Sequence, residues 1–129
     1  MRTVINEVKG VCKAIGDYSY VVKVSRREMV FCSGLTGLDE SGKLVAGGLG
    51  AQARQAFRRL RQVLKAADAT PEDVVRLNVY LTTFEGIEDY NAASREFFKG
   101  KFPPCTLVRV AGLWLPDMLV EIEATAVLD

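Results

Sequence analysis

The stretch FPPCTLVRVAGLWLPDMLVEIEATAV, residues 102–127, carries the pattern from which the fold of this chain can be predicted. We interpret it as two strands joined by a short turn at residues 115–117, where proline fixes φ and aspartate can bond its own backbone. After the turn, residues alternate with the period of a strand that has two unlike faces. Glu121 and Glu123 then point the same way from a strand otherwise built for burial. A buried carboxylate needs a partner or a chemical role, so Glu121 is a candidate functional residue, and Cys105 on the preceding strand is a second.

The rest of the chain predicts a single α+β domain of residues 1–129 with the element order β-β-β-α-β-α-β-β. The earlier strands are predicted at residues 3–5, 19–25, 28–33 and 75–81, and the helices at residues 52–67 and 87–98. The two residues Arg26 and Arg27 separate the second and third strands, a spacing that predicts a hairpin. In the second helix, Tyr90 and Ser94 fall on the stripe that the 3.6-residue period buries.

The predicted elements leave one face of the sheet uncovered. Two helices cover one face of a mixed sheet, and a chain of 129 residues has no further element for the apolar residues of the other face. Burial against sister subunits in a closed ring is the economical solution. We therefore expect a homo-oligomer.

Composition and charge describe an ordinary globular protein, with 49 % apolar residues, 26 % charged residues and a net charge of +1. This charge gives no electrostatic reason to expect nucleic acid or an anionic membrane as a partner. No apolar run is long enough to span a membrane, and the N-terminus has no apolar segment typical of a signal peptide. Three cysteines without CxxC spacing favour a reducing compartment, so we expect a cytoplasmic protein.

The chain contains no histidine. This excludes Ser-His-Asp and Cys-His activation of a nucleophile, and it excludes most zinc sites, because three scattered cysteines are not a credible ligand set. We expect no metal and no cofactor. Acid–base chemistry near neutral pH would have to come from a glutamate, cysteine, lysine or tyrosine with a shifted pKa, or from water.

The first predicted helix carries a basic run, made of Arg54, Arg58, Arg59, Arg61 and Lys65. Such a run could be a patch for RNA, or simply the solvated face of an amphipathic helix. We favour the solvated face, because aromatic residues do not interleave with the arginines and the chain has almost no net positive charge.

Six short motifs occur in an order and spacing that is specific when they are taken together. They are Ala14-Ile15-Gly16-x-Tyr18, Ser33-Gly34, Ala51-Gln52-x-x-Gln55-Ala56, Tyr90-Asn91-x-x-x-x-x-Phe97-Phe98, Phe102-Pro103 and Val120-Glu121-Ile122-Glu123-Ala124. Across almost its whole length the chain thereby resembles the Rid family, the reactive-intermediate deaminases also called YjgF or L-PSP proteins. The resemblance implies a chorismate-mutase-like α+β fold and a homotrimer with three clefts between its subunits.

The resemblance also implies an activity and a set of site residues. Deaminating members hydrolyse enamines and imines such as 2-aminoacrylate to 2-keto acids and ammonia, without a cofactor. By the matching positions, Glu121 would position or activate the water. The residues that would line the cleft and hold the substrate are Tyr18, Ser33, Gly34 and Asn91.

Cys105 occupies the position where deaminating members carry an arginine that clamps the substrate carboxylate. A guanidinium grips a carboxylate through two charge-assisted hydrogen bonds, whereas a thiol offers one weak donor. We therefore expect a substrate preference shifted away from simple 2-imino acids. Cys105 could itself be a nucleophile, or it could be a small residue that lines a less polar pocket, which we favour.

The other site residues have structural alternatives. Glu121 could pair with a basic side chain across a subunit interface instead of activating water. Tyr18 and Asn91 could cap a loop and a helix, and Ser33-Gly34 could simply end a strand.

Three functions fit this reading. The first is a Rid-type hydrolase or deaminase that acts on imines, enamines or related reactive intermediates in a cleft between subunits. The second is a non-catalytic trimer that binds or senses a small molecule in the same cleft. The third is an endoribonuclease of the L-PSP type, which the lack of histidine and the near-neutral charge disfavour.

Overall fold

The computed structural model describes residues 2–10, 13–14, 16–25 and 28–129. Four strands form a mixed sheet in the order β3-β6-β4-β5. Their bounds are Glu28–Thr36 for β3, Val120–Leu128 for β6, Val74–Leu81 for β4 and Cys105–Arg109 for β5. Strand β6 is antiparallel to both neighbours, whereas β5 runs parallel to β4.

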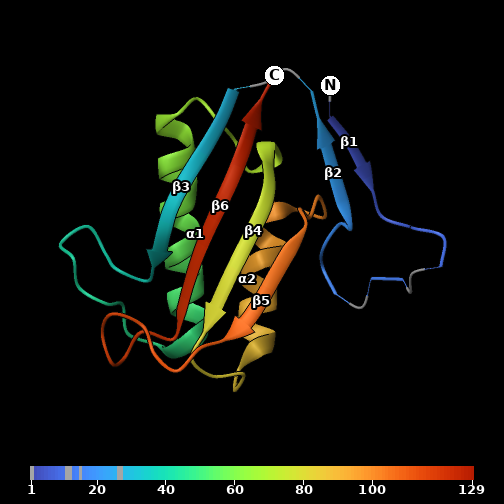
Figure 1. The fold of residues 1–129 in the computed structure, drawn as a ribbon. Helices are drawn as coiled ribbons and strands as arrows, with labels where there is room; N and C mark the ends of the chain where they lie inside the picture. The colour runs from blue at the N-terminus through green and yellow to red at the C-terminus, as the bar shows by residue number, and fades with distance from the viewer. Residues whose placement is uncertain (1, 11–12, 15, 26–27) are drawn as a thin grey trace.

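Two helices, α1 (Gly48–Ala66) and α2 (Ile87–Phe98), lie together behind one face of this sheet (Figure 1). A 3₁₀ turn at Pro71–Asp73 leads into β4. The α+β class, the mixed sheet with both helices on one face and the predicted order of the elements are confirmed. Helix α2 has the predicted bounds, and α1 begins four residues earlier than residue 52.

The core lies between the helices and the sheet, where the predicted alternation of β6 is observed. The buried residues of β6 include Val120, Ile122, Ala124 and Ala126, all at most 4 % exposed. Against them pack the apolar stripes of the helices, which include Phe57, Leu60 and Leu64 of α1 and Tyr90, Phe97 and Phe98 of α2. The rings of Phe57 and Phe97 lie 4.9 Å apart and join the two helices. Full burial of one such side chain contributes roughly 1.5–3 kcal/mol to the free energy of unfolding.

The two strands of the quoted stretch do not pair with each other as predicted. Strand β4 lies between β5 and β6 and bonds to both. The physical reason is that residues 110–119 form a connection too long for a tight turn, so β6 can cross to the far side of β4. The Pro-Asp turn chemistry is local, and it cannot specify which strand becomes the neighbour.

The predicted hairpin of the second and third strands is also wrong. Strand β2 (Val21–Val24) pairs instead with β1 (Arg2–Ile5) in a separate two-stranded ribbon, and β3 pairs with β6. The expected turn at Arg26-Arg27 lies outside the described residues. The ribbon lies beyond β5 in Figure 1. Hydrogen bonds fix it there, from Ser19 N to Pro103 O at 3.2 Å and from Arg2 Nη2 to Val74 O at 3.1 Å.

Strand β3 does not end at Ser33 but continues to Thr36. Its register with β6 shifts between Cys32 and Leu35, which identifies Ser33-Gly34 as a β-bulge. Both bulge residues are exposed, whereas Leu35 beyond them is buried against the helices. The strand-end interpretation is therefore corrected to a bulge, a feature that re-aims side chains at a sheet edge.

The sheet face away from the helices carries exposed apolar side chains. Phe31 and Met29 of β3 are 73 % and 56 % exposed, and Val108 of β5 is 41 % exposed. A large aromatic ring in water is the kind of surface that marks an interface. The homotrimer that the sequence predicts would bury these side chains.

Candidate functional site

A pocket of about 420 Å³ lies where β5, α2 and residues 16–18 meet. Its lining residues are Gly16, Asp17, Tyr18, Leu77, Tyr90, Asn91, Ser94, Phe98, Pro103, Cys105 and Leu107. The structure therefore brings together three of the predicted site residues, Tyr18, Asn91 and Cys105. The volume is in the range of small-molecule sites, roughly 300–1,000 Å³.

Cys105 opens β5 and contributes a half-buried thiol to this pocket. Burial raises the pKa of the thiol to about 11, although the Arg76 guanidinium acts in the opposite direction. Reactive cysteines have a lowered pKa, because the thiolate is the nucleophile. The Cys105 thiol is neutral at physiological pH, which favours the pocket-lining interpretation over the nucleophile.

Helix α2 supplies three polar side chains to the pocket, Tyr90, Asn91 and Ser94. Burial raises the pKa of the Tyr90 phenol far above its ordinary value, and a hydrogen bond between Tyr90 and Ser94 partly offsets that effect. The sequence predicts Tyr90 and Ser94 only as buried packing residues. That they line the pocket together with Asn91 was not predicted. The available signal was a pair of hydroxyls on an otherwise apolar helical stripe, one turn apart.

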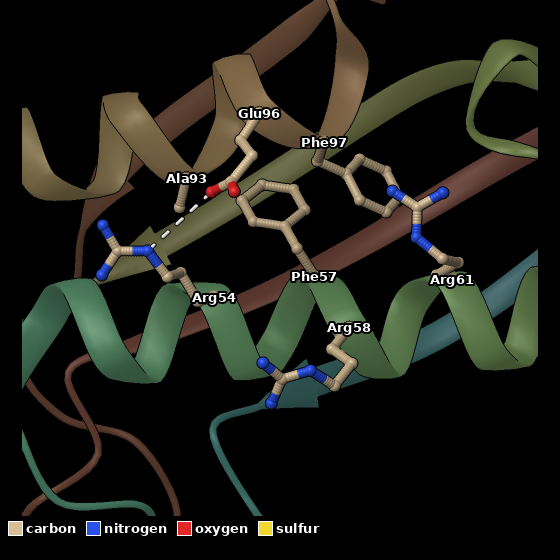
Figure 2. Close-up of a pocket in the computed structure, with 7 residues that line it drawn as sticks. All are labelled: Arg54, Phe57, Arg58, Arg61, Ala93, Glu96 and Phe97. Carbon is tan, nitrogen blue, oxygen red and sulfur yellow. Dashed lines mark ion pairs between the residues drawn. The ribbon is translucent and has the colours of Figure 1, made fainter.

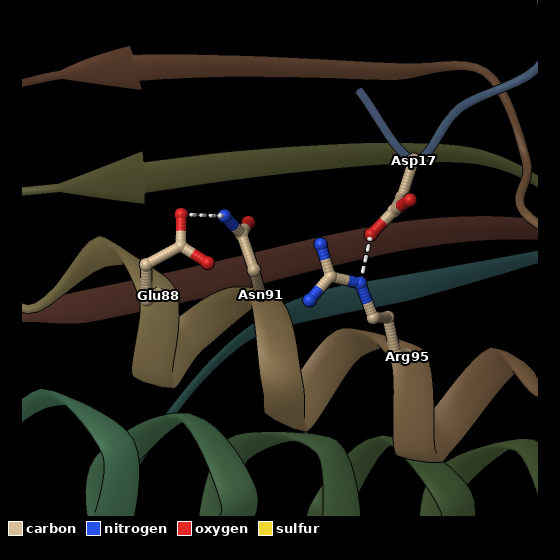
Figure 3. Close-up of polar contacts among 4 residues, drawn as sticks. All are labelled: Asp17, Glu88, Asn91 and Arg95. Atoms are coloured by element: carbon tan, nitrogen blue, oxygen red, sulfur yellow. Dashed lines mark hydrogen bonds and ion pairs between the residues drawn. The ribbon is translucent and has the colours of Figure 1, made fainter. Parts of the chain in front are cut away.

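An ion pair fixes the segment that carries Tyr18 to the outer side of α2. Arg95 Nε donates to Asp17 Oδ2 at 2.8 Å, and one turn earlier Asn91 Nδ2 approaches Glu88 Oε1 at 3.5 Å (Figure 3). Figure 3 shows Asp17 reaching down from its loop onto the guanidinium of Arg95. Asp17 is the only charged residue that the described part of the chain contributes to the pocket lining, and Arg95 neutralises it. Among the described residues that line the pocket there is therefore no free cation for an anionic ligand group.

Glu121 and Gly34 form a second group on β6 and β3. Glu121 lies in register with Thr36 and Tyr80, between the buried residues Val120 and Ile122, so its side chain is on the sheet face away from the helices. A Cβ atom on Gly34 would lie 2.2 Å from Glu121 Oε1, so any larger residue there would push the Glu121 carboxylate from its position. The bulge thereby brings the Gly34 backbone against the Glu121 carboxylate.

Glu123, two residues further along β6, has partners on its own sheet. Its Oε1 accepts hydrogen bonds from the Tyr80 hydroxyl at 2.5 Å and from Asn78 Nδ2 at 3.1 Å. The hydrogen bond to Glu123 is also the main reason that the pKa of Tyr80 is raised. Glu123 thus has the structural role expected of a paired carboxylate.

Within one chain, Cys105 and Glu121 do not face the same space. Cys105 is in register with Leu77, which in turn pairs with Ala124 on the helix side of the sheet. Glu121 pairs with Tyr80, which alternates to the opposite side. These two candidate residues therefore do not adjoin inside one subunit. The site consists of two parts, the pocket with Tyr18, Asn91 and Cys105, and the bulge with Gly34 and Glu121.

In the described part of the chain, no group of three or more histidine, cysteine, aspartate or glutamate side chains is placed to hold a metal ion. No described helix has the length and apolar character needed to cross a bilayer.

A mixed sheet backed by two helices on one face, with a small pocket at the β5 edge, places this chain among small α+β proteins. The family described as Endoribonuclease L-PSP matches residues 9–128, and the chain belongs to this family, which is also called YjgF or Rid. The predicted family membership is confirmed.

Relatives are similar along their whole length. A human protein named 2-iminobutanoate/2-iminopropanoate deaminase is 35 % identical over 98 % of this chain and 93 % of its own, and the mouse protein of that name is 37 % identical over 98 % and 95 %. Among solved structures, the Rid-family protein YyfB from Yersinia pestis superposes with a TM-score of 0.89 at 33 % identity, with 98 % of each chain covered.

Proposed function

We propose that this protein is a Rid-type hydrolase that deaminates small imines or enamines, and that its preferred substrates lack the carboxylate of 2-imino acids. The support for the reaction class is the similarity to relatives named 2-iminobutanoate/2-iminopropanoate deaminase, at 35–37 % identity over 98 % of the chain. The support for the altered preference is local to the pocket.

The observation that carries the substrate preference is the charge of the pocket lining. Cys105 stands where a carboxylate clamp would be, its thiol is neutral, and Asp17 is already paired with Arg95. A substrate carboxylate buried there without a cation would lose its hydration and gain no ion pair, a cost of several kcal/mol. A neutral substituent at the same place contacts Leu77, Leu107 and the thiol.

The two parts of the site can meet only between copies of the chain. The pocket opens at the β5 edge on the helix side, while Glu121 and Gly34 lie on the opposite face of the sheet. In the proposed homotrimer, the open face with Phe31 and Met29 is covered by a neighbour, and the bulge of one subunit faces the pocket of the next. The catalytic cleft then belongs to two subunits.

The reaction follows from these groups. The imine takes up a proton from solvent on its nitrogen, and Glu121 accepts a proton from water as the water oxygen bonds to the carbon, to give a carbinolamine. Glu121 then returns its proton to the amino nitrogen and the C–N bond breaks to release ammonia. The hydroxyl proton passes to solvent and leaves the carbonyl compound, so the proton taken up at the start is given back. Tyr18 and Asn91 hold the substrate, and Ser33, which is exposed at the bulge beside Gly34, adds a hydroxyl to the cleft. An enamine enters the same sequence after tautomerising to its imine.

Turnover of freshly generated imines tests the proposal. An amino-acid oxidase supplies 2-iminopropanoate, an amine oxidase supplies imines without a carboxylate, and release of the carbonyl product is followed with and without the protein. Faster release from the uncharged imines is expected, and Glu121→Gln should abolish it. Glu123→Gln is the matched control on the same strand face, because its amide oxygen can still accept from Tyr80 and Asn78.

Cys105→Arg tests the substrate preference. A guanidinium at this position should recover about 2–3 kcal/mol of orientation and raise hydrolysis of 2-iminopropanoate by roughly 30- to 150-fold. If the wild-type protein accelerates no imine but binds a small ligand saturably, the non-catalytic binding trimer replaces the enzyme. If wild type already prefers 2-iminopropanoate, the proposed preference is wrong while the reaction class stands.

A further inference from the structure

A second pocket lies on the outer surface of the helix layer, away from the candidate site. Its lining residues are Arg54, Phe57, Arg58 and Arg61 of α1 and Ala93, Glu96 and Phe97 of α2, and its volume is about 210 Å³. We propose that this arginine pocket binds the phosphate group of a small phosphorylated metabolite.

The charge pattern of α1 is the first reason. In its 19 residues the helix carries four arginines and one lysine but no aspartate or glutamate. Like charges four residues apart, such as Arg54 and Arg58, destabilise a helix, and a solvated helix face ordinarily relieves this with acidic residues at the same spacing. Within α1 this relief is missing, and Glu96 of α2 supplies only a long ion pair to Arg54. An external anion between the guanidiniums would therefore reduce the remaining repulsion among the arginines.

The arrangement of the side chains is the second reason. Figure 2 shows the three guanidiniums spread around the rings of Phe57 and Phe97, with Glu96 on the side of Arg54. The ion pair between Arg54 Nε and Glu96 Oε2 is long, at 3.9 Å, and both side chains are largely exposed. The guanidinium carbon of Arg61 lies 4.9 Å from the centroid of the Phe97 ring, which holds this side chain over the pocket. Arg58 Nη1 donates to Gln55 Oε1 within α1, and a guanidinium has five N–H donors, so further donors are left for an anion.

The charge balance matches one phosphate group. Three arginines and one glutamate line the pocket, which leaves two positive charges. A phosphate monoester carries about −1.5 to −2 at neutral pH, and arginine is the side chain best suited to its oxygens. A single carboxylate would neutralise only half of this charge.

The floor and the size of the pocket limit what can enter. Phe57, Ala93 and Phe97 are at most 5 % exposed and form an immobile apolar floor. At about 210 Å³ the pocket is smaller than typical sites for whole drug-sized ligands, which start at roughly 300 Å³. It therefore holds the phosphate and leaves the rest of the metabolite at the surface.

The arginine pocket stays accessible in the proposed trimer. It lies on the helix layer, whereas Phe31, Met29 and Glu121 lie on the opposite face of the sheet, where the neighbours would pack. Changes to the arginine pocket can therefore be made without touching the residues of the candidate site.

Calorimetric titration with phenyl phosphate at low ionic strength tests the proposal, with phenol and inorganic phosphate as companion probes. We expect saturable binding of one phenyl phosphate per chain, weaker binding of inorganic phosphate and none of phenol. Arg58→Gln and Arg61→Gln should each weaken binding about 10-fold or more. Glu96→Gln should tighten it several-fold, because it removes the competing carboxylate.

Lys65→Gln is the matched control, since it removes one positive charge from the same helix outside the pocket. It should leave the affinity within about twofold, and circular dichroism should show unchanged folding for every variant. Equal weakening by Lys65→Gln and Arg58→Gln would mean that only the general charge of the helix is sensed, and would overturn the proposal. So would absence of saturation, or preferential Arg58-dependent binding of a single-stranded RNA oligonucleotide.

Discussion

The Cys105 thiol should be alkylated about 100-fold more slowly in the native protein than in the unfolded chain. Burial raises the pKa of Cys105 from an ordinary 9.0 to about 11. At a fixed pH well below both values, each unit by which the pKa rises lowers the thiolate fraction tenfold, so at pH 7–8 the native thiolate is about 100-fold scarcer. This fraction sets the rate, because the thiolate is the attacking species, and the half-buried position in the pocket can only slow the reaction further.

Iodoacetamide labelling followed by mass spectrometry of the peptide that contains Cys105 measures this rate. The same protein in denaturant is the matched control, because it presents the same thiol in the same local sequence. The logarithm of the native rate should rise with unit slope between pH 7 and 10 without a plateau, and Cys105→Ser should retain hydrolysis of uncharged imines within a few-fold.

A nucleophilic Cys105 gives the opposite results. Labelling would be as fast in the native as in the unfolded protein, it would level off near neutral pH, and Cys105→Ser would be inactive. Any of these findings would refute the assignment of Cys105 as a residue that only shapes the pocket.

Two further predictions concern the open sheet face and the bulge. Phe31→Arg should convert the expected trimer to monomers in sedimentation and abolish activity. The reason is that a charge buried at the interface would replace a ring that is 73 % exposed in the single chain. The control Val63→Arg, on the outer side of α1, should leave the trimer intact. Gly34→Ala should lower kcat/KM about 100-fold with little effect on assembly, because its Cβ would displace the Glu121 carboxylate from a position only 2.2 Å away. A fully active Gly34→Ala protein, or a Phe31→Arg protein that remains trimeric, would contradict the respective role.

Local patterns in the sequence predicted the elements well, and they failed where pairing depends on distant residues. The period of α2 fixed its bounds at Ile87–Phe98, and the alternation of β6 identified its buried face. The pairing of β6 with β3 and β4 was not predictable in this way, because strand partners are chosen by how the whole sheet covers the helices. Turn signals such as Pro116-Asp117 describe a bend in the chain but not the strand that follows it.

The same limit applies to the site. Family motifs identified Tyr18, Asn91 and Cys105, and these three line one pocket. The ion pair of Asp17 with Arg95 joins residues 78 positions apart, and both stand at unspecified positions of their motifs. The net charge of a pocket depends on such distant residues. The sequence therefore predicted that the position of Cys105 lacks a cation, but it did not predict that Arg95 neutralises the Asp17 carboxylate.

The separation of Cys105 and Glu121 by the sheet has a consequence for how function depends on assembly. Alternation along a strand places neighbours on opposite faces, and the registers of β4 with β5 and β6 fix which face each residue takes. Shifting Glu121 to the pocket side would require a one-residue slip of β6, which would expose Val120, Ile122, Ala124 and Ala126. Burial of four apolar side chains opposes this slip by several kcal/mol. One folded chain therefore keeps Glu121, the proposed water-activating carboxylate, apart from the candidate substrate pocket. In our proposal, a second copy brings its own open face to the β5 edge, and the hydrolysis becomes possible only in that assembly.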